Sequence, residues 1–279
     1  MKLIIKITAS LLTLTSPLSV IPPTLATPLP NDSETPISTS QTEEALLHQQ
    51  QYLQLLPELK ALQQTPFSDL TPEQRVRLNE LHSLRQELRQ SFNEFIDHPE
   101  IRDATAQLGQ SGPVSILALE DLSSLQDNLA NLQQSTVLLY PLILEARLEL
   151  ILITPDAPPL RRTVAVNAAA LNQTIFEFRQ VLQSPNQNPL PPAQQLYQWL
   201  IAPFENELAQ LNTEAIIFSP DRTLRYIPLA ALHDGDQWLV EHFTLNTITS
   251  ARLNNFATAP TATPRLLLAG FTEGKADIN

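Results

Sequence analysis

This sequence of 279 residues contains neither of the common signatures of a cysteine or serine nucleophile. It contains no cysteine, which excludes disulfides, thiolate metal ligands and a cysteine nucleophile. No G-x-S-x-G run provides a serine nucleophile. Ser219 stands before Pro220 at the end of an apolar run, where a cap or turn residue is expected. The residue types therefore predict no catalytic residue.

The histidines are the remaining candidates for metal ligands or general bases. Their spacing forms neither an H-x-x-H nor an H-E-x-x-H pattern, either of which would place two ligands on one helix face. They are His48, His82, His98, His233 and His242. We therefore expect no metal site. The chain has only 5 glycines and no G-x-G-x-x-G or Walker-type run, so we expect no cofactor-binding residues and no cofactor.

Two pairs of acidic residues could support a different hydrolysis. Glu205 and Glu207, and likewise Asp234 and Asp236, are two positions apart. Paired carboxylates can act as general acid and base. At this spacing on a strand or turn, however, they are typical of a solvated surface. A carboxylate-based hydrolase therefore stays as an alternative hypothesis only.

The overall charge limits the partners. The formal net charge is -12 and the sequence pI is about 4.8. Nucleic acid and anionic membrane surfaces attract positive proteins, so neither is an expected partner. The chain is 43% hydrophobic and 16% charged, which allows a sizeable core. We expect a protein partner or a polypeptide substrate.

The first residues have the pattern of an export signal. Lys2 and Lys6 precede an apolar run over residues 7–20, and small residues surround a plausible cleavage point after Ala26. The sequence predicts a signal peptide over 1–26 and a periplasmic or extracellular protein, with no stable membrane insertion after cleavage. The alternative is a short membrane anchor, but Ser16-Pro17 interrupts the run and it is short for a span. Residues 27–42 are rich in Pro, Ser, Thr and acid, which predicts a disordered linker.

Residues 43–135 show a helical pattern. A first helix begins at Glu43 and Pro57 ends or kinks it. Thr71-Pro72-Glu73-Gln74 is a capped helix start, and His98-Pro99 marks its stop. A third helix is expected over 121–134. The apolar positions of the first two helices are Leu46, Leu47, Leu53 and Leu56, then Leu81, Leu84, Leu88, Phe92 and Phe95. Such stripes predict core packing, with a partner-binding coiled coil as the alternative.

Residues 136–279 change to a strand pattern mixed with helices. Two apolar runs, 137–144 and 148–154, predict a hairpin, and Pro141 suits an edge strand or a bulge. A third strand is expected over 162–166, and buried strands over 215–219 and 265–270. Asn167 caps a helix over 168–183, and Pro192 opens one over 193–211 that Pro203 kinks. Asp234-Gly235 predicts a tight turn between two strands.

These elements resemble the amino-terminal part of the CHAT-domain family, in the caspase-like cysteine peptidase clan. The matching stretches are VLLYPLILEARLELILIT, LYQWLIAPFENEL, AIIFSPDRTLRYIPLAALHDGDQWLVEHF and RLLLAG. The resemblance covers about residues 115–279. It implies an α/β fold: a helical N-terminal region (43–135), then an incomplete caspase-like α/β sandwich over 136–279 that begins with an antiparallel strand pair. Within it, we interpret 223–243 as scaffold, with a substrate-contacting lip as the alternative.

The resemblance also implies a chemistry that this sequence lacks. In the family, a thiolate attacks a carbonyl with a neighbouring histidine as base. Both follow strands later than the RLLLAG-like one, and His233 and His242 do not match the family's catalytic histidine. We therefore expect a truncated, inactive peptidase-like protein. The alternative is a non-enzymatic scaffold that binds partners through its helical region. Missing strands would leave sheet edges uncovered, so self-association is also expected.

Overall fold

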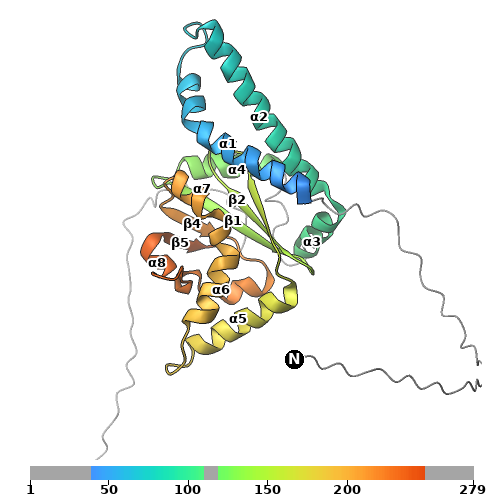
Figure 1. Ribbon diagram of the computed structural model, residues 1–279, viewed down its shortest axis with the longest axis vertical. Coiled ribbons are helices and arrows are strands. Elements are labelled where there is room, and N and C mark those ends of the chain that lie inside the picture. Colours follow the sequence, from blue (N-terminus) through green and yellow to red (C-terminus); the bar gives the residue numbers. More distant parts are fainter. Residues whose placement is uncertain (1–38, 110–118, 249–279) are drawn as a thin grey trace, which may run out of the picture. The chain divides into compact units, whose positions relative to one another are not determined.

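The computed structural model describes residues 39–109 and 119–248. The predicted signal peptide, residues 27–38 of the predicted linker and the predicted strand at 265–270 lie outside these residues, whereas residues 39–42 of the linker belong to a helix. The helices that precede the sheet are α1 (Thr39–Gln64), α2 (Pro72–Asp97), α3 (Pro99–Gly109) and α4 (Leu119–Ala130). As Figure 1 shows, α1 and α2 form a long antiparallel hairpin. None of the described helices is long and apolar enough to span a membrane.

Helix α2 begins where its sequence predicts. The Thr71 hydroxyl accepts from the Gln74 backbone N–H at 3.3 Å, and the Gln74 side chain accepts from the Thr71 N–H at 2.9 Å. This reciprocal pair satisfies two backbone donors that the helix leaves unpaired. The helix ends at Asp97 and is capped by His98, whose backbone N–H donates to the Phe95 carbonyl. Pro99 then starts α3, a helix that the sequence analysis did not predict.

Helix α1 departs from its prediction in two ways. It begins at Thr39, earlier than the predicted Glu43. It continues through Pro57 to Gln64, so the proline does not end it, and a kink at Pro57 stays a prediction. Leu53, Leu56, Leu59 and Leu62 are all buried, and this packing offsets the backbone hydrogen bond that Pro57 cannot donate. The second difference is Leu47, which the apolar stripe predicts to be buried but which is 65% exposed.

The sheet has five strands in the order β3-β2-β1-β4-β5. β1 (Thr136–Ile143), β2 (Leu148–Ile153) and β3 (Leu160–Val164) form an antiparallel meander, which confirms the predicted hairpin. β4 (Ala215–Phe218) pairs in parallel with β1, and β5 (Thr244–Thr247) in parallel with β4. A helical region followed by an α/β sheet is the fold class that the sequence predicts.

Pro141 lies in a central strand, so the prediction of an edge strand is wrong. β1 stands between β2 and β4, and Pro141 is in register with Leu150 of β2. β4, however, pairs with β1 only as far as Leu139. Pro141 therefore lies just past the end of this ladder, where its missing N–H removes no strand-to-strand bond.

The crossover from β3 to β4 is helical. It contains α5 (Ala168–Leu182), α6 (Leu190–Leu200), the 3₁₀ turn η2 (Ala202–Phe204) and α7 (Glu205–Gln210). The Asn167 side chain accepts from the Ala170 N–H at 2.8 Å, which confirms the predicted cap. The predicted helix 193–211 begins earlier, at Leu190, and the bend predicted at Pro203 is a break into separate helices. After β4 come the 3₁₀ turns η3 (Arg222–Tyr226) and η4 (Leu229–Ala231), then α8 (Leu239–His242).

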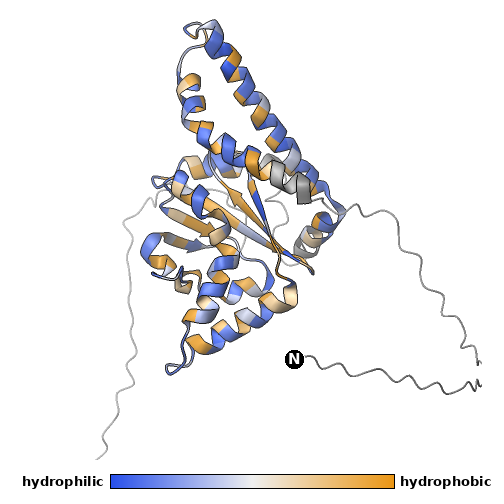
Figure 2. Ribbon diagram, viewed as in Figure 1, coloured by the Kyte–Doolittle hydropathy of each residue, from blue (hydrophilic) through white to orange (hydrophobic). Residues whose placement is uncertain are grey.

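Both faces of the sheet carry a hydrophobic core. Along β1, Val137 and Leu139 belong to the first core, and Leu138 and Leu142 belong to the second. The first core packs against α1, α5 and α6, and the second against the end of α2, α3 and α4. Figure 2 shows mostly hydrophobic residues along β1, β2 and β4, and a mixture of hydrophobic and hydrophilic residues on the helices. The stripes of α1 and α2 therefore pack mainly as core, as their spacing predicts.

Candidate functional site

The stretch from Thr223 to Phe243 packs as scaffold. Five of its apolar side chains enter the first core and are at most 8% exposed; they are Leu224, Ile227, Leu229, Leu232 and Leu239. Tyr226 and Val240 of the same stretch are 63% and 57% exposed. Arg222, just before the stretch, has a backbone φ of 41°, a conformation that residues other than glycine rarely adopt. The chain therefore turns sharply out of β4 and is then held by buried leucines.

A turn at Asp234-Gly235 brings two of the histidines together. Asp234 Oδ1 accepts from the N–H groups of Asp236 and Gln237, both at 2.7 Å, and Asp234 Oδ2 lies 3.0 Å from His242 Nε2. His233 Nδ1 accepts from the Gly235 N–H at 3.0 Å, and its ring meets Trp238 edge-on. The turn is flanked by a single bridge between His233 and Trp238 rather than by the two strands expected. Both histidines are engaged within the turn.

The carboxyl ends of β1 and β4 meet at a buried carboxyl group. Asp221 is 2% exposed, and its Oδ2 accepts from the Ile143 N–H at 3.4 Å. Its Oδ1 has no hydrogen-bond partner in the described part of the chain. In open α/β sheets, ligands bind at this edge, between strands whose connections leave in opposite directions. Here the carboxyl is sealed from solvent, so in this conformation it supports the loop and contacts no ligand.

The environments of Asp221 and Asp234 shift their pKa values in opposite directions. Burial raises the pKa of Asp221 above its ordinary range. The hydrogen bond from the Ile143 N–H and the nearby arginines act to lower this pKa, but burial outweighs them. Burial also acts to raise the pKa of Asp234, but its bonds from Gln237, Asp236 and His242 outweigh burial and hold that pKa below the ordinary value. Asp221 therefore stabilises the fold below the ordinary aspartate pKa of about 3.9 and loses this effect as pH rises through its raised pKa. Asp234 contributes stability above about 3.9 and loses it as pH falls through its lowered pKa.

The pH dependence of two variants follows from these shifts. The free energy of unfolding of each variant is compared with that of the unmodified protein at the same pH. As pH rises from ~3 to ~7, this difference is expected to shift in favour of Asp221→Asn and against Asp234→Asn. Urea unfolding followed by circular dichroism at several pH values measures both. Parallel trends for the two variants would contradict the assigned environments.

The acidic pairs do not form a site. Glu207 is 3% exposed and pairs with Arg162 of β3, although its spacing suggested a solvated surface. Glu205 is exposed and hydrogen-bonds to Tyr197 instead. Asp234 accepts hydrogen bonds from backbone N–H groups within its own turn, and Asp236 is exposed. The carboxylates of each pair thus serve separate contacts.

The remaining histidines lie on the first two helices. His48 is on α1, His82 on α2 lies 3.4 Å from the Gln63 side chain, and His98 caps the end of α2. None of them joins the turn of His233 and His242. Within residues 39–109 and 119–248, no group of three metal-ligating side chains is close enough to hold an ion.

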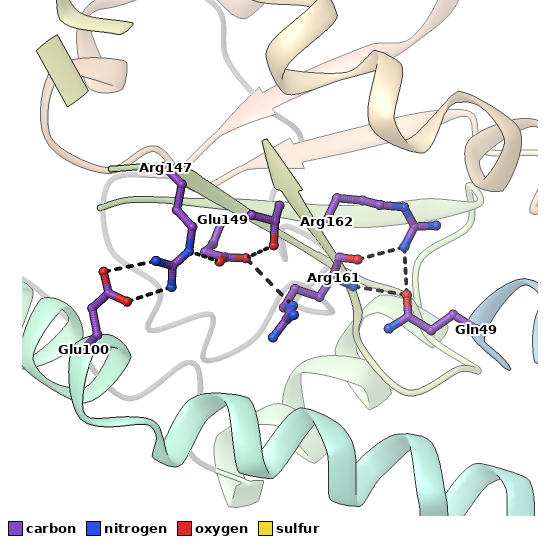
Figure 3. A network of polar contacts seen from close by, with 7 residues as sticks. Gln49, Glu100, Arg147, Glu149, Arg161 and Arg162 are labelled. Carbon is purple, nitrogen blue, oxygen red and sulfur yellow. Dashed lines mark hydrogen bonds and ion pairs between the residues drawn. The ribbon is translucent and has the colours of Figure 1, made fainter. Parts of the chain in front are cut away.

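The densest polar cluster is one that the sequence analysis missed. Glu149, 1% exposed in the apolar strand β2, accepts from Arg147 Nε at 2.6 Å and from the Thr163 hydroxyl at 2.9 Å, and lies 3.8 Å from Arg161 Nε. Arg147 also binds Glu100 of α3 at 2.7 Å (Figure 3). The cluster connects β2 and β3 to the helical region. A lone acid within LELILI was the available signal, because a buried charge requires a partner.

The same cluster closes one edge of the sheet. The Gln49 side chain on α1 accepts from the Arg161 backbone N–H at 3.4 Å and from Arg162 Nη1 at 2.8 Å (Figure 3). Arg161 also stacks 4.3 Å from the Phe95 ring centroid, and Arg162 lies 5.2 Å from that of Phe204. These arginines thus fasten the edge strand β3 to α1, α2 and the crossover, which is a structural role.

The comparison with protein families agrees with the α/β fold described above. The family model of the CHAT domain matches residues 190–275, which span α6 to β5 and continue beyond the described residues. The resemblance to the CHAT-domain family is thereby confirmed for this C-terminal part of the chain. No curated protein matches the chain.

Proposed function

We propose that this chain is a non-catalytic CHAT-domain protein that binds another polypeptide and does not cleave it. The observation that carries the proposal is the absence of cysteine from all 279 residues of a chain whose C-terminal part matches the CHAT-domain model. Thiol peptidase chemistry needs a thiolate, a base within hydrogen-bond reach and donors for the oxyanion. This chain supplies no thiolate, which supports the non-catalytic part of the proposal.

The described residues offer no replacement for that chemistry. His233 packs against Trp238, and His242 pairs with Asp234, so neither faces a hydroxyl nucleophile. Ser219 is 6% exposed, and its backbone N–H donates to the Leu139 carbonyl at the end of the β1–β4 ladder. These contacts support a structural role for each of the three.

A quenched-fluorescent peptide library tests the proposal. We expect the purified chain to release no fluorescence above buffer, with or without reducing agent, while a thiol peptidase run in parallel does so. Turnover that co-purifies with the chain and is abolished by Ser219→Ala, His233→Ala or His242→Ala would overturn the proposal.

A second candidate, partner binding through the helical region, rests on the loop between α1 and α2. Phe67 of this loop is 65% exposed, and Val76 in the first turns of α2 is 59% exposed. The guanidinium of Arg75, also on α2, lies 4.9 Å from the Phe67 ring centroid. Exposed aromatic residues beside arginine are frequent at protein interfaces. Leu88 and Phe92, by contrast, are at most 6% exposed, so substituting them would disturb packing and not a binding face.

Immobilised chain can test this loop. We expect Phe67→Asp to lose polypeptides that the unmodified chain retains, and Ser68→Asp, at a neighbouring exposed position, to keep them. Equal retention by both variants would argue against the loop as the contact.

We also propose export through residues 1–26, supported by Lys2, Lys6 and the apolar run at 7–20. Residues 1–30 fused to a phosphatase that is active only outside the cytoplasm should give activity in a bacterial host. The same fusion carrying Leu11→Arg and Leu12→Arg should give none. Phosphatase activity that survives those substitutions would contradict the proposal.

A further inference from the structure

The two edges of the sheet differ in how they are covered. Gln49 closes part of the β3 edge, as described above. At the other edge, β5 pairs only with β4 among the described residues. The ladder runs from Thr244 opposite Ala215 to Thr247 opposite Phe218, and the Ile248 N–H donates to the Phe218 carbonyl. The outer backbone groups of β5 face no other strand in this part of the chain.

A hollow of about 550 Å³ lies beside this edge, on the face that carries the second core. Leu129 of α4 and Leu138 of β1 are at most 1% exposed, so that core is complete over β1. The hollow lies between the loop after α4 and the end of β5. Its walls are formed by the loop after α4, by β4 and by the end of β5, and include Gln133, Gln134, Ala215, Ile217, Asn246 and Ile248. Ile217 belongs to the second core, and Leu132 and Ile248 pack against it, so the hollow borders that core.

We propose that residues 249–279 of the same chain fold back over this hollow and that their apolar run, Leu266–Ala269, fills it. The chain leaves β5 at Ile248, which is half-buried and lines the hollow. The 16 residues from 249 to 264 can extend by about 3.3 Å each, which is ample to return to the hollow. The CHAT-domain match runs from 190 to 275, through β5 and into this segment. This inference is independent of whether the chain is catalytic.

A second copy of the chain is a less favourable occupant. β5 has only 4 residues, with Thr244, Asn246 and Thr247 exposed, and a short polar edge strand disfavours pairing between molecules. A tethered segment, in contrast, loses no translational freedom when it docks.

Engineered cysteines test the proposal cleanly, because the natural chain has none and each pair can form only one intramolecular disulfide. Gln133→Cys or Asn246→Cys is combined with Leu266→Cys, Leu267→Cys or Leu268→Cys. The variants are oxidised gently and analysed on non-reducing gels and by peptide mass spectrometry. We expect an intramolecular disulfide in at least one pair, since a bridge requires Cα atoms within about 7 Å. Gln63→Cys on α1, combined with the same leucine positions, is expected to give none.

The other outcomes would overturn the proposal. Disulfides found only between molecules would assign the hollow to a second copy. No disulfide in any of the six pairs would show that the run does not reach it. Circular dichroism under reducing conditions confirms that each variant is folded. Independently of crosslinking, Leu267→Asp is expected to lower the thermal unfolding midpoint more than Thr261→Asp does, and equal midpoints would contradict the proposal.

Discussion

Glu149→Ala is expected to lower the free energy of unfolding by about 3–5 kcal/mol. The carboxylate is 1% exposed, binds Arg147 and Thr163 directly and lies close to Arg161. Its removal leaves two partly buried guanidinium groups without their shared counter-charge. Breaking such a pair costs more than the pair itself contributes, because the remaining charge stays desolvated. Urea unfolding at neutral pH, followed by circular dichroism, measures the change.

Two further variants separate the buried carboxylate from its exposed neighbour. Glu149→Gln can keep the bond from Thr163 but loses the charge, so we expect an intermediate loss. Glu100→Ala removes the other acid bound to Arg147. The Glu100 side chain is 39% exposed, so this substitution should lower the free energy of unfolding by only about 0–1 kcal/mol. Equal losses for Glu100→Ala and Glu149→Ala would show that burial of Glu149 does not govern the cluster.

Phe178→Ala is the second substitution with a large expected effect, a loss of about 3–5 kcal/mol. Phe178 is 0% exposed on α5 and belongs to the first core. Truncation removes its buried apolar area and leaves a cavity that the surrounding leucines fill only in part.

Phe176 provides a matched control on the same helix. It is 55% exposed, so Phe176→Ala changes the same residue type at nearly the same helical position without opening a cavity. We expect a change within about 0.5 kcal/mol. Chemical unfolding of both variants tests the orientation of α5, and similar losses would mean that the helix is rotated from the position described.

Local signals predicted the starts of α2 and α5 and the β1–β2 hairpin. Thr71 and Asn167 cap their helices because the bonds that define a cap are made within a few residues. The β1–β2 hairpin is also a local contact. The two prolines were harder to interpret, since burial of the leucines around Pro57 and the position of β4 beside β1 are properties of the whole fold.

The polar groups that matter most in the fold were not predictable as a set. Glu149 and Arg161 are brought together by the β2–β3 register, and Glu100 joins through packing of α3, a helix absent from the prediction. Asp221 is buried against the end of β1, a contact between segments that are far apart in the sequence. For chemistry, in contrast, composition was informative, because the absence of cysteine needs no structure to be recognised.

The central structural claim is that β1 and β4 pair within one sheet, which joins the hairpin to the part of the chain that matches the CHAT domain. Native-state hydrogen exchange, followed by mass spectrometry, tests it most directly. We predict that peptides covering 136–143 and 215–218 exchange together, at the slow rate set by global unfolding. Rapid exchange over 215–218 while 136–143 and 148–153 stay protected would show that the two parts unfold separately and would contradict the claim.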